Sequence, residues 1–325
     1  MTRSSIRDLR LAYIIHRLKE KEILGAQTMN EHQWKQTLHQ INPSLTINLL
    51  TVNDTGWDHT IVTVNNDTVF RFPKKPDSEA LLRKEWSFVR TIQRTKFMLP
   101  VPELSPVYND AILIALTYTL IDGIPLHTVE STTTLSQHDF RKLGHFLSTI
   151  HGINPSELEG FEHLHTLTFW SELYSSLQAE VYPFLDANLT VHIDHVFQDF
   201  LNQFDTTYRN YQNVPIHGDL TTSNMIYSPE DQKLAGIIDF TDAQLGDPAF
   251  DFAGLYWAYG SDLVKQLLNH YPTNLSKEDM LYRIEHFYGL QPLFHHLLYV
   301  QRKNRLHEAK PMIKRFLELK DRSFL

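Results

Sequence analysis

Cysteine is absent from this chain of 325 residues. Disulfide bonds, cysteine nucleophiles and cysteine-ligated zinc are therefore excluded. Basic residues are also in deficit, because 30 lysines and arginines face 38 aspartates and glutamates and the formal net charge is -8. Nucleic acids and anionic membranes both attract basic surfaces, so the sequence predicts neither as a partner. The same charge is compatible with a small cationic ligand.

Long hydrophobic runs are also lacking. The longest nearly unbroken apolar run, at residues 111–121, is too short to cross a bilayer as a helix and is predicted to be a buried strand. The amino terminus has no apolar signal-peptide core followed by a small-residue cleavage site. We therefore expect a cytoplasmic protein without membrane association. Its hydrophobic content of 42% is typical of a folded protein, and its length suits two lobes.

Residues 1–28 differ from the rest of the chain and are predicted to form an N-terminal extension. They combine several lysines and arginines with a modest apolar stripe. A basic amphipathic helix of this kind can contact a membrane or a partner, but a plain surface helix or a translated leader is the interpretation we favour. The folded part of the chain is expected to begin at Met29.

Hydrophobic periodicity divides the remainder into two unlike parts. Residues 29–120 follow mainly the alternating pattern of strands, and residues 121–325 follow mainly the helical period. Strands are predicted at 49–53, 60–65, 68–72 and 111–120, and a helix at 78–93. Helices are predicted at 136–151, 167–186, 192–211 and from about 252 onward, with a loop-rich stretch at 215–251. The expected fold class is α+β, with an antiparallel sheet in the first lobe and a mainly helical second lobe.

The most informative polar residues lie in the loop-rich stretch. Asp219 comes five residues before Asn224 in a loop between two short apolar segments, and Asp239 ends a third apolar segment. Since both loops follow strand ends, we expect these three side chains to lie close together. Carboxylate and amide oxygens suit Mg²⁺, which takes one or two carboxylates together with phosphate oxygens and water. An aspartate beside them can accept the proton of an attacking hydroxyl.

Several motifs of this region resemble the aminoglycoside phosphotransferase family, the antibiotic-kinase relatives of protein kinases. His-Gly-Asp at 217–219 with Asn224 resembles the catalytic loop, and Ile-Asp-Phe at 238–240 resembles the magnesium-binding segment. The run 242–253, with Gly-Asp-Pro-Ala-Phe-Asp inside it, is similar to the signature that follows in the family. This long match is the specific part, because a lone His-Gly-Asp is a weak signal.

The resemblance implies a bilobal protein-kinase-like fold and a small-molecule kinase. Asp219 would be the catalytic base, Asn224 and Asp239 would be ligands of Mg²⁺, and ATP or GTP would be the phosphoryl donor. The lobe at 29–120 would bind the nucleotide phosphates. The lobe at 121–325 would carry the catalytic loop and bind the acceptor.

The first lobe resembles the same family. Phe-Arg-Phe-Pro at 70–73 resembles the strand that carries the phosphate-contacting cation. The resemblance implies that Arg71 holds the nucleotide phosphates and that Glu85, on the following helix, orients Arg71. A loop with a single glycine, Gly56, takes the place of a glycine-rich phosphate loop. Its backbone N–H groups and the Thr55 or Thr60 hydroxyl are expected to reach phosphate.

The interlobe hinge is expected after the buried strand. Backbone groups around Tyr118 and Leu120 would there bind the nucleobase. Three positions depart from the pattern of the family. Arg71 stands where lysine is common, Thr241 replaces the usual glycine after Asp-Phe, and Thr-Thr-Ser at 221–223 stands where relatives often have a His-Pro-Gly-like stretch. The first change is not neutral, because a guanidinium is bulkier than an ammonium group and has a fixed geometry.

Neighbouring polar residues are assigned structural roles. His217 is expected to brace the catalytic loop by hydrogen bonds rather than to transfer protons. Asp247 and Asp251 are expected to cap and fix the loop and the helix that follow. His145 and His151 are more typical of polar surface or satisfied core positions than of a zinc site.

The acceptor is expected to be a small molecule bound on the second lobe of a monomer or a homodimer. A cationic aminoglycoside would need several carboxylates facing the cleft, and a macrolide would need a larger apolar surface with one acid. A metabolic kinase acting on choline, homoserine or a sugar is an alternative, and a nucleotide-binding pseudokinase is a weaker one. The candidate acceptor residues are Asp262, Glu278, Asp279 and Glu285 and the aromatic residues Tyr256, Trp257 and Tyr259.

Overall fold

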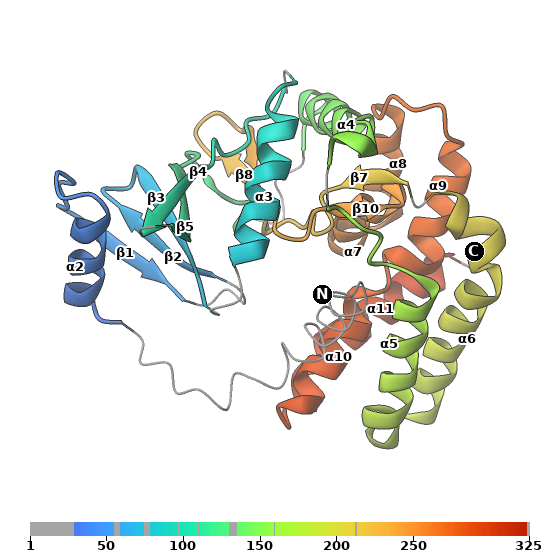
Figure 1. Cartoon of the computed structure of the whole chain (residues 1–325). Helices are drawn as coiled ribbons and strands as arrows, with labels where there is room; N and C mark the ends of the chain where they lie inside the picture. The colour runs from blue at the N-terminus through green and yellow to red at the C-terminus, as the bar shows by residue number, and fades with distance from the viewer. Residues whose placement is uncertain are drawn as a thin grey trace.

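The computed structural model has two lobes of unlike composition, with a small sheet in the first and mainly helices in the second (Figure 1). We call residues 29–120 the N-lobe and residues 121–323 the C-lobe. The predicted extension at residues 1–28 and the predicted phosphate-loop residues Thr55 and Gly56 lie outside the described residues. The structure describes residues 29–54, 59–74, 79–95, 98–109, 111–129, 135–158, 160–211 and 213–323.

The N-lobe sheet has five antiparallel strands in the order β1-β2-β3-β5-β4. Strands β2 and β3 are joined by a tight turn in which Asn65 and Asn66 both adopt positive φ angles, 54° and 53°. Asparagine tolerates this left-handed conformation, which the right-handed twist of a hairpin requires. The five strands are β1 (Leu50–Asn53), β2 (His59–Val64), β3 (Thr68–Pro73), β4 (Ser105–Asn109) and β5 (Ile112–Thr119).

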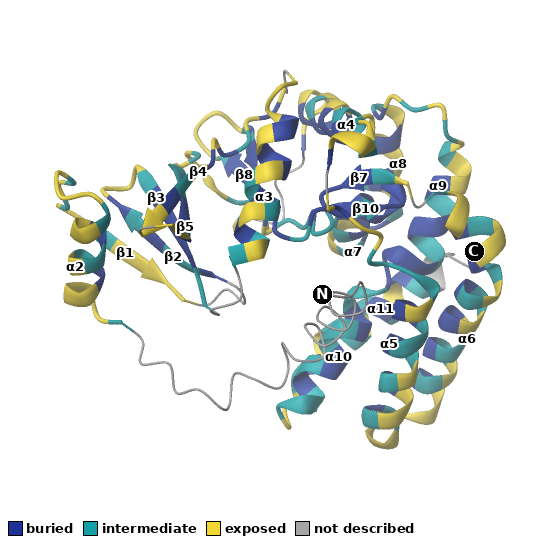
Figure 2. Cartoon of the chain, viewed as in Figure 1, coloured by how far each residue is buried: buried dark blue, intermediate teal, exposed yellow. Residues whose placement is uncertain are grey.

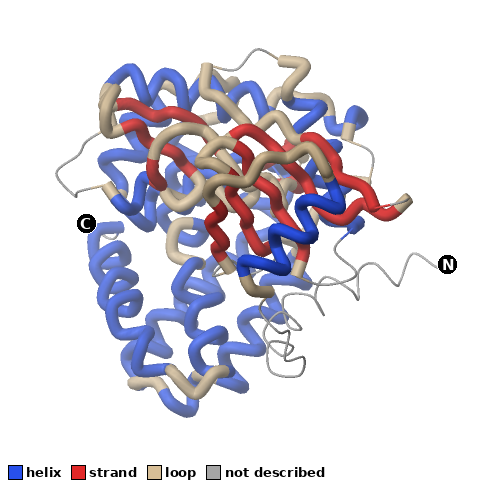
Figure 3. The backbone as a smooth tube through the Cα atoms, turned by 90° about the vertical axis from the view of Figure 1, so that its left-hand side faces the viewer, coloured by secondary structure: helices blue, strands red, loops and turns tan. Residues whose placement is uncertain are grey.

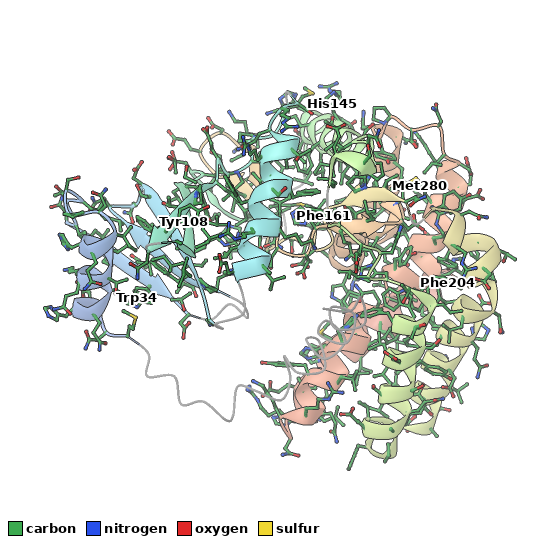
Figure 4. The ribbon with its side chains drawn as sticks, viewed as in Figure 1. Trp34, Tyr108, His145, Phe161, Phe204 and Met280 are labelled. Carbon is green, nitrogen blue, oxygen red and sulfur yellow. The ribbon has the colours of Figure 1, made fainter. Side chains whose placement is uncertain are left out.

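Alternation along the strands gives the sheet two different faces. Helix α2 (Glu31–Ile41) covers the outer face with Trp34 and Leu38, and the Trp34 ring lies 4.9 Å from that of Phe72 (Figure 4). Arg71, one residue along β3, has the opposite orientation and lies on the inner face toward the C-lobe. The period-two pattern of β3 thus sends aromatic side chains outward and a cation inward.

Helix α3 (Glu79–Ile92) lies between the N-lobe sheet and the C-lobe (Figure 1). Its Phe88 ring contacts two C-lobe rings, with centroid distances of 5.5 Å to Phe161 and 5.8 Å to Phe240. Figure 4 shows Phe161 at this junction. The apolar face of α3 therefore belongs to a core that continues into the C-lobe, and this packing brings Glu85 to the lobe interface.

The C-lobe surrounds short strands with helices. In the view of Figure 3 the C-lobe helices lie behind the strands of the N-lobe. Buried residues concentrate on the strands and on the facing sides of the helices (Figure 2). The strands are β6 (Ile124–Pro125), β7 (Val214–Ile216), β8 (Met225–Ser228), β9 (Lys233–Ile237) and β10 (Gln244–Gly246). The α-helices are α4 (Gln137–His151), α5 (Leu167–Glu180), α6 (Ala187–Gln203), α7 (Ala253–Tyr259), α8 (Ser261–Asn269), α9 (Lys277–Arg283), α10 (Pro292–Arg302) and α11 (Lys310–Ser323).

The loop-rich stretch of the sequence contains two small sheets. Strand β7 pairs with β10, and β8 pairs with β6 and β9, so the segments on either side of the Asp219 loop are strands as predicted. The helix predicted at 167–186 ends earlier, at Glu180, because Pro183 lacks the N–H that a helix interior needs. Within the part of the chain that the structure describes, no helix has the length and apolarity needed to span a membrane.

Candidate active site

The loop between β7 and β8 positions Asp219 and Asn224. It turns at Gly218, where φ is +81° and an added Cβ would lie 2.2 Å from the carbonyl oxygen of Asp242, so only glycine fits. The Asn224 amide group donates from Nδ2 to the main-chain oxygen of Asp219 at 2.8 Å and to its Oδ2 at 2.9 Å. These two bonds fix the direction of the Asp219 carboxylate.

The His217 ring holds this loop in place through hydrogen bonds at both of its nitrogens. The ring is buried, and its Nε2 lies 3.2 Å from the carbonyl oxygen of Ile238, so Nε2 carries the hydrogen. The other ring nitrogen, Nδ1, then accepts the Asp219 N–H at 3.3 Å. Burial lowers the pKa of His217, which favours the neutral ring that this arrangement requires. The predicted bracing role is confirmed.

Asp251 fixes the start of the same loop. Its two carboxylate oxygens accept the backbone N–H groups of His217 at 2.8 Å and Gly218 at 2.9 Å. The His151 ring lies 3.1 Å from Asp251 through Nε2 and 2.9 Å from the Tyr271 hydroxyl through Nδ1. Asp251 therefore holds the loop as predicted, and His151 is a satisfied core histidine.

Replacing Asp251 with asparagine should weaken the acid sensitivity of the fold. Burial raises the pKa of Asp251, but hydrogen bonds from His151 and Gly218 outweigh it and bring the pKa below its ordinary value. Stabilisation by such a carboxylate is present above the ordinary pKa of about 4 and is lost as the pH falls through the folded-state value. Denaturation between pH 6 and pH 3 should show a steeper loss of unfolding free energy for the unmodified protein than for Asp251→Asn.

A matched control for this titration is Asp205→Asn, because Asp205 is exposed and pairs with the equally exposed Arg209. Its pH dependence should match that of the unmodified protein. At pH 7, Asp251→Asn should also lower the unfolding free energy by roughly 1.5–3 kcal/mol, the range for hydrogen bonds to a charged group. Parallel pH curves for Asp251→Asn and the unmodified protein would contradict the assignment.

Asp247 fixes the segment that follows. Its carboxylate accepts the Ala249 N–H at 2.9 Å, which caps a short 3₁₀-helix at 248–252, as predicted. It also forms a buried two-point ion pair with Arg283, at 2.6 and 3.0 Å. The Arg283 guanidinium lies 3.7 Å over the ring of Tyr211, and the sequence alone did not indicate this pairing.

Asp239 follows β9, beside the Asp219 loop. Strand β9 pairs with β8, and the Ile238 N–H donates to the Asn224 carbonyl oxygen at 2.9 Å, so the predicted proximity of Asp239 and Asn224 is observed. Asp239 has a positive φ of 65°, which aspartate tolerates better than most residues. The carboxylate is thereby directed toward the N-lobe.

The N-lobe contributes a buried arginine to this carboxylate. Arg71 Nη2 donates to Asp239 Oδ1 at 2.9 Å, and Arg71 Nη1 donates to Glu85 Oε1. Glu85 Oε1 also accepts the backbone N–H of Phe240 at 3.1 Å. The predicted pairing of Arg71 with Glu85 is therefore present, and it extends across the interface between the lobes.

Electrostatics act differently on the two carboxyl groups of this cluster. Burial by itself raises the pKa of Asp239. The attraction of Arg71 and the hydrogen bond from Thr241 outweigh this effect, so the pKa of Asp239 lies well below its ordinary value. Burial raises the pKa of Glu85, and the attraction of Arg71 offsets only part of this. Burial also raises the pKa of Tyr118 to about 12. The cluster thus pairs one guanidinium with two carboxylates next to a neutral phenol.

The oxygen atoms near Asp219 fit a magnesium ion. Asn224 uses its Nδ2 toward Asp219, and no hydrogen bond to its Oδ1 occurs within the described residues. Asp239 adds a half-exposed carboxylate. An amide oxygen and one carboxylate are a suitable protein contribution for Mg²⁺, which keeps water and phosphate oxygens as its other ligands. The described residues hold no group of three or more histidine, aspartate or glutamate side chains that could by themselves hold a metal ion.

The remaining predicted nucleotide contacts include groups that already have hydrogen-bond partners inside the N-lobe. The Thr60 hydroxyl donates to Asp54 Oδ1 at 2.8 Å, across the base of the loop that contains Gly56. The Leu120 N–H donates to the Asp67 carbonyl oxygen at 2.5 Å. A nucleobase bound at the hinge would therefore use backbone groups other than this N–H.

Two residues of the cluster were not assigned a role from the sequence. Thr241 had been noted only as a departure from the family pattern, yet its buried hydroxyl lies 2.9 Å from Arg71 Nη2 and 2.8 Å from Asp239 Oδ1. The buried His59 lies 3.3 Å from Arg71 Nη2 through Nδ1. Strand alternation was the available signal for His59, since it faces the same side of the sheet as Arg71.

Solved structures with the same architecture are antibiotic kinases. The GDP complex of wild-type aminoglycoside 2'-phosphotransferase-IIIa has a TM-score of 0.77 and 19% identity, covering 91% of this chain and 100% of that one. Macrolide 2'-phosphotransferase type I has a TM-score of 0.66 and 18% identity, with 88% and 98% covered. The streptomycin–ATP–APH(2″)-IIa ternary complex has a TM-score of 0.61 and 20% identity, with 83% and 91% covered. The fold is thus that of the bilobal, protein-kinase-like phosphotransferases.

The sequence itself identifies the family. Residues 50–281 match the family described as the phosphotransferase enzyme family, which is more than half of the chain. The chain belongs to this family, and it is a phosphotransferase that uses an alcohol group as acceptor. No curated protein sequence matches it.

Proposed function

We propose that this protein transfers the γ-phosphate of ATP or GTP to a hydroxyl group of an aminoglycoside or macrolide antibiotic. The observation that carries the proposal is the grouping of Asp219, Asn224 and Asp239 at one edge of the C-lobe, opposite the buried Arg71–Glu85 pair. The similarity to kinases solved with GDP and with ATP supports a nucleoside triphosphate as donor.

Each residue has a defined part in this reaction. Asp219, oriented by Asn224, accepts the proton of the acceptor hydroxyl as that oxygen attacks the γ-phosphorus. The bond between the γ-phosphorus and its bridging oxygen breaks, and ADP or GDP leaves. Asn224 and Asp239 would hold Mg²⁺, which supplies positive charge to the phosphate oxygens. Arg71 adds a fixed positive charge beside Asp239, and Glu85 keeps the guanidinium in place. Catalysis of this type consists mainly of positioning and charge neutralisation.

The acceptor would bind on the C-lobe next to Asp219. Helix α7 packs closely against the catalytic loop that carries Asp219. An added Cβ on Gly254 of this helix would lie only 2.5 Å from the carbonyl oxygen of Leu220 in the loop. In α7, Tyr256 is buried in the core, whereas Tyr259 is exposed, so the predicted aromatic cluster is only partly available to a ligand. The candidate carboxylates lie on α8, on α9 and on the π-helical segment Ile284–Tyr288 that follows α9. Asp262, Glu278 and Asp279 are exposed, and Glu285 accepts the Ser261 hydroxyl.

A substrate panel tests the proposal. Nucleotide consumption should be measured with ATP and with GTP, against aminoglycosides, macrolides, choline, homoserine and simple sugars, and each product should be checked by mass for one added phosphoryl group. Antibiotic-dependent turnover is the expected result. Turnover with choline or homoserine alone would instead establish a metabolic kinase, and nucleotide binding without turnover on any acceptor would indicate a pseudokinase.

A further inference from the structure

The Thr241 hydroxyl lies where three charged side chains meet. Its Oγ1 is 2.8 Å from Asp239 Oδ1, 2.9 Å from Arg71 Nη2 and 3.4 Å from Glu85 Oε2. A hydroxyl has one hydrogen to donate and lone pairs to accept with. The arginine can only donate, so Oγ1 accepts from Arg71 and gives its hydrogen to a carboxylate, of which Asp239 is the nearer.

The two oxygens of Asp239 consequently have different surroundings. Oδ1 accepts from Arg71 Nη2 at 2.9 Å and from the Thr241 hydroxyl, and the Thr241 backbone N–H lies 3.4 Å away. Within the described part of the chain, no hydrogen bond to Oδ2 occurs, and 42% of the Asp239 side chain is exposed whereas only 4% of the Arg71 side chain is. One oxygen is therefore committed to the lobe interface, and the other remains available to a ligand.

We propose that Thr241 is a positioning residue that makes Asp239 a one-oxygen ligand, so that the site prefers Mg²⁺ to the larger Ca²⁺. The inference rests on the proposed function and deepens it. Mg²⁺ requires near-octahedral geometry and few protein oxygens, whereas Ca²⁺ takes six to eight oxygens and accepts carboxylates that bind through both. With Oδ1 engaged by Thr241 and Arg71, Asp239 can offer only Oδ2.

Removal of the Thr241 hydroxyl should change the choice of cation as well as the affinity. Thr241→Val has nearly the same shape but removes the hydroxyl donor to Asp239 Oδ1, which frees a lone pair of that oxygen for a cation. Loss of a hydrogen-bond partner of a metal ligand typically weakens metal binding by about 10- to 100-fold. We expect a loss of about tenfold for Mg²⁺ and a smaller loss for Ca²⁺. Thr241→Ser keeps the hydroxyl and should restore both affinities.

The experiment uses the full chain and measures binding rather than turnover. Mg²⁺ and Ca²⁺ are titrated by calorimetry in the presence of a saturating, non-hydrolysable ATP or GTP analogue, with no acceptor added. Thr117→Val is the matched control, because the Thr117 hydroxyl donates to the Val69 carbonyl oxygen at 2.9 Å within the N-lobe sheet, away from the carboxylates. This control should leave both affinities unchanged. Thr241→Ala replaces Thr241→Val if the valine variant does not fold.

The outcomes separate this inference from the proposed function. A reduced preference for Mg²⁺ in Thr241→Val, with recovery in Thr241→Ser, supports the inference. Equal losses for the two cations would indicate a general loosening of the site and would overturn it, as would unchanged affinities or a failure of serine to restore them. If the unmodified protein binds neither cation with nucleotide, the proposed function fails and the inference fails with it.

Discussion

Asp219→Asn should lower kcat by roughly 10²- to 10⁴-fold, the contribution expected of a general base. The asparagine keeps the shape of the side chain, and its amide oxygen can still accept the hydrogen that Asn224 Nδ2 now gives to Asp219 Oδ2. Nucleotide affinity and melting temperature should therefore stay close to those of the unmodified protein. Steady-state kinetics, nucleotide titration and thermal unfolding of one preparation provide the three measurements.

A matched control for this variant is Asp231→Asn. Asp231 lies in the exposed turn between β8 and β9, pairs with Lys233, and is in the same lobe as Asp219. It should retain full activity. If Asp219→Asn turns over substrate at the normal rate, Asp219 is not the base, and a parallel loss of nucleotide binding would show that the carboxylate acts before the chemical step.

Arg71→Met should lower the unfolding free energy by about 3–5 kcal/mol and abolish turnover. The Arg71 and Glu85 side chains are almost fully buried, and removing one partner of such a pair leaves an uncompensated charge in the interior. Asp239 is less affected, because its side chain is partly exposed and can be solvated. Chemical denaturation measures the stability, and nucleotide-dependent turnover measures the activity.

The double variant Arg71→Met/Glu85→Gln separates the two effects. It removes both charges of the pair, so most of the lost stability should return, whereas turnover should stay absent because the positive charge beside Asp239 is missing. Arg83→Met is the matched control on the same helix, since Arg83 pairs with Glu79 on the exposed side of α3. This change should cost less than about 1 kcal/mol. Equal costs for Arg71→Met and Arg83→Met would contradict the buried charge network.

Local patterns were sufficient to predict the parts of the site that are close in sequence. Asp219 and Asn224 are five residues apart in one loop, and the apolar segments on either side became strands that hold both ends. Arg71 and Glu85 are 14 residues apart on a strand and the next helix, and they form the pair that the resemblance to the family implied. In such cases the strand and helix periods already restrict which side chains can meet.

Contacts between distant segments were decided by the packing of the lobes. Arg71 meets Asp239 across 168 residues, and His151 meets Asp251 across 100. No local period relates such positions. His151 and Asp251 come together only through the packing of α4 inside the C-lobe. Arg71 and Asp239 come together only when α3 packs its apolar face against the C-lobe. The same packing engages Thr241, whose residue type had only marked a departure from the family pattern.

The sequence by itself thus determined the reaction class, since the carboxylates and the amide that it requires stand at fixed spacing in two adjoining loops. The tertiary structure decided how those groups are oriented and charged. It placed one guanidinium between Glu85 and Asp239, and it turned one oxygen of Asp239 away from the site. Burial of that cluster between two lobes is a property of the folded chain as a whole, which is why no single segment of the sequence could indicate it.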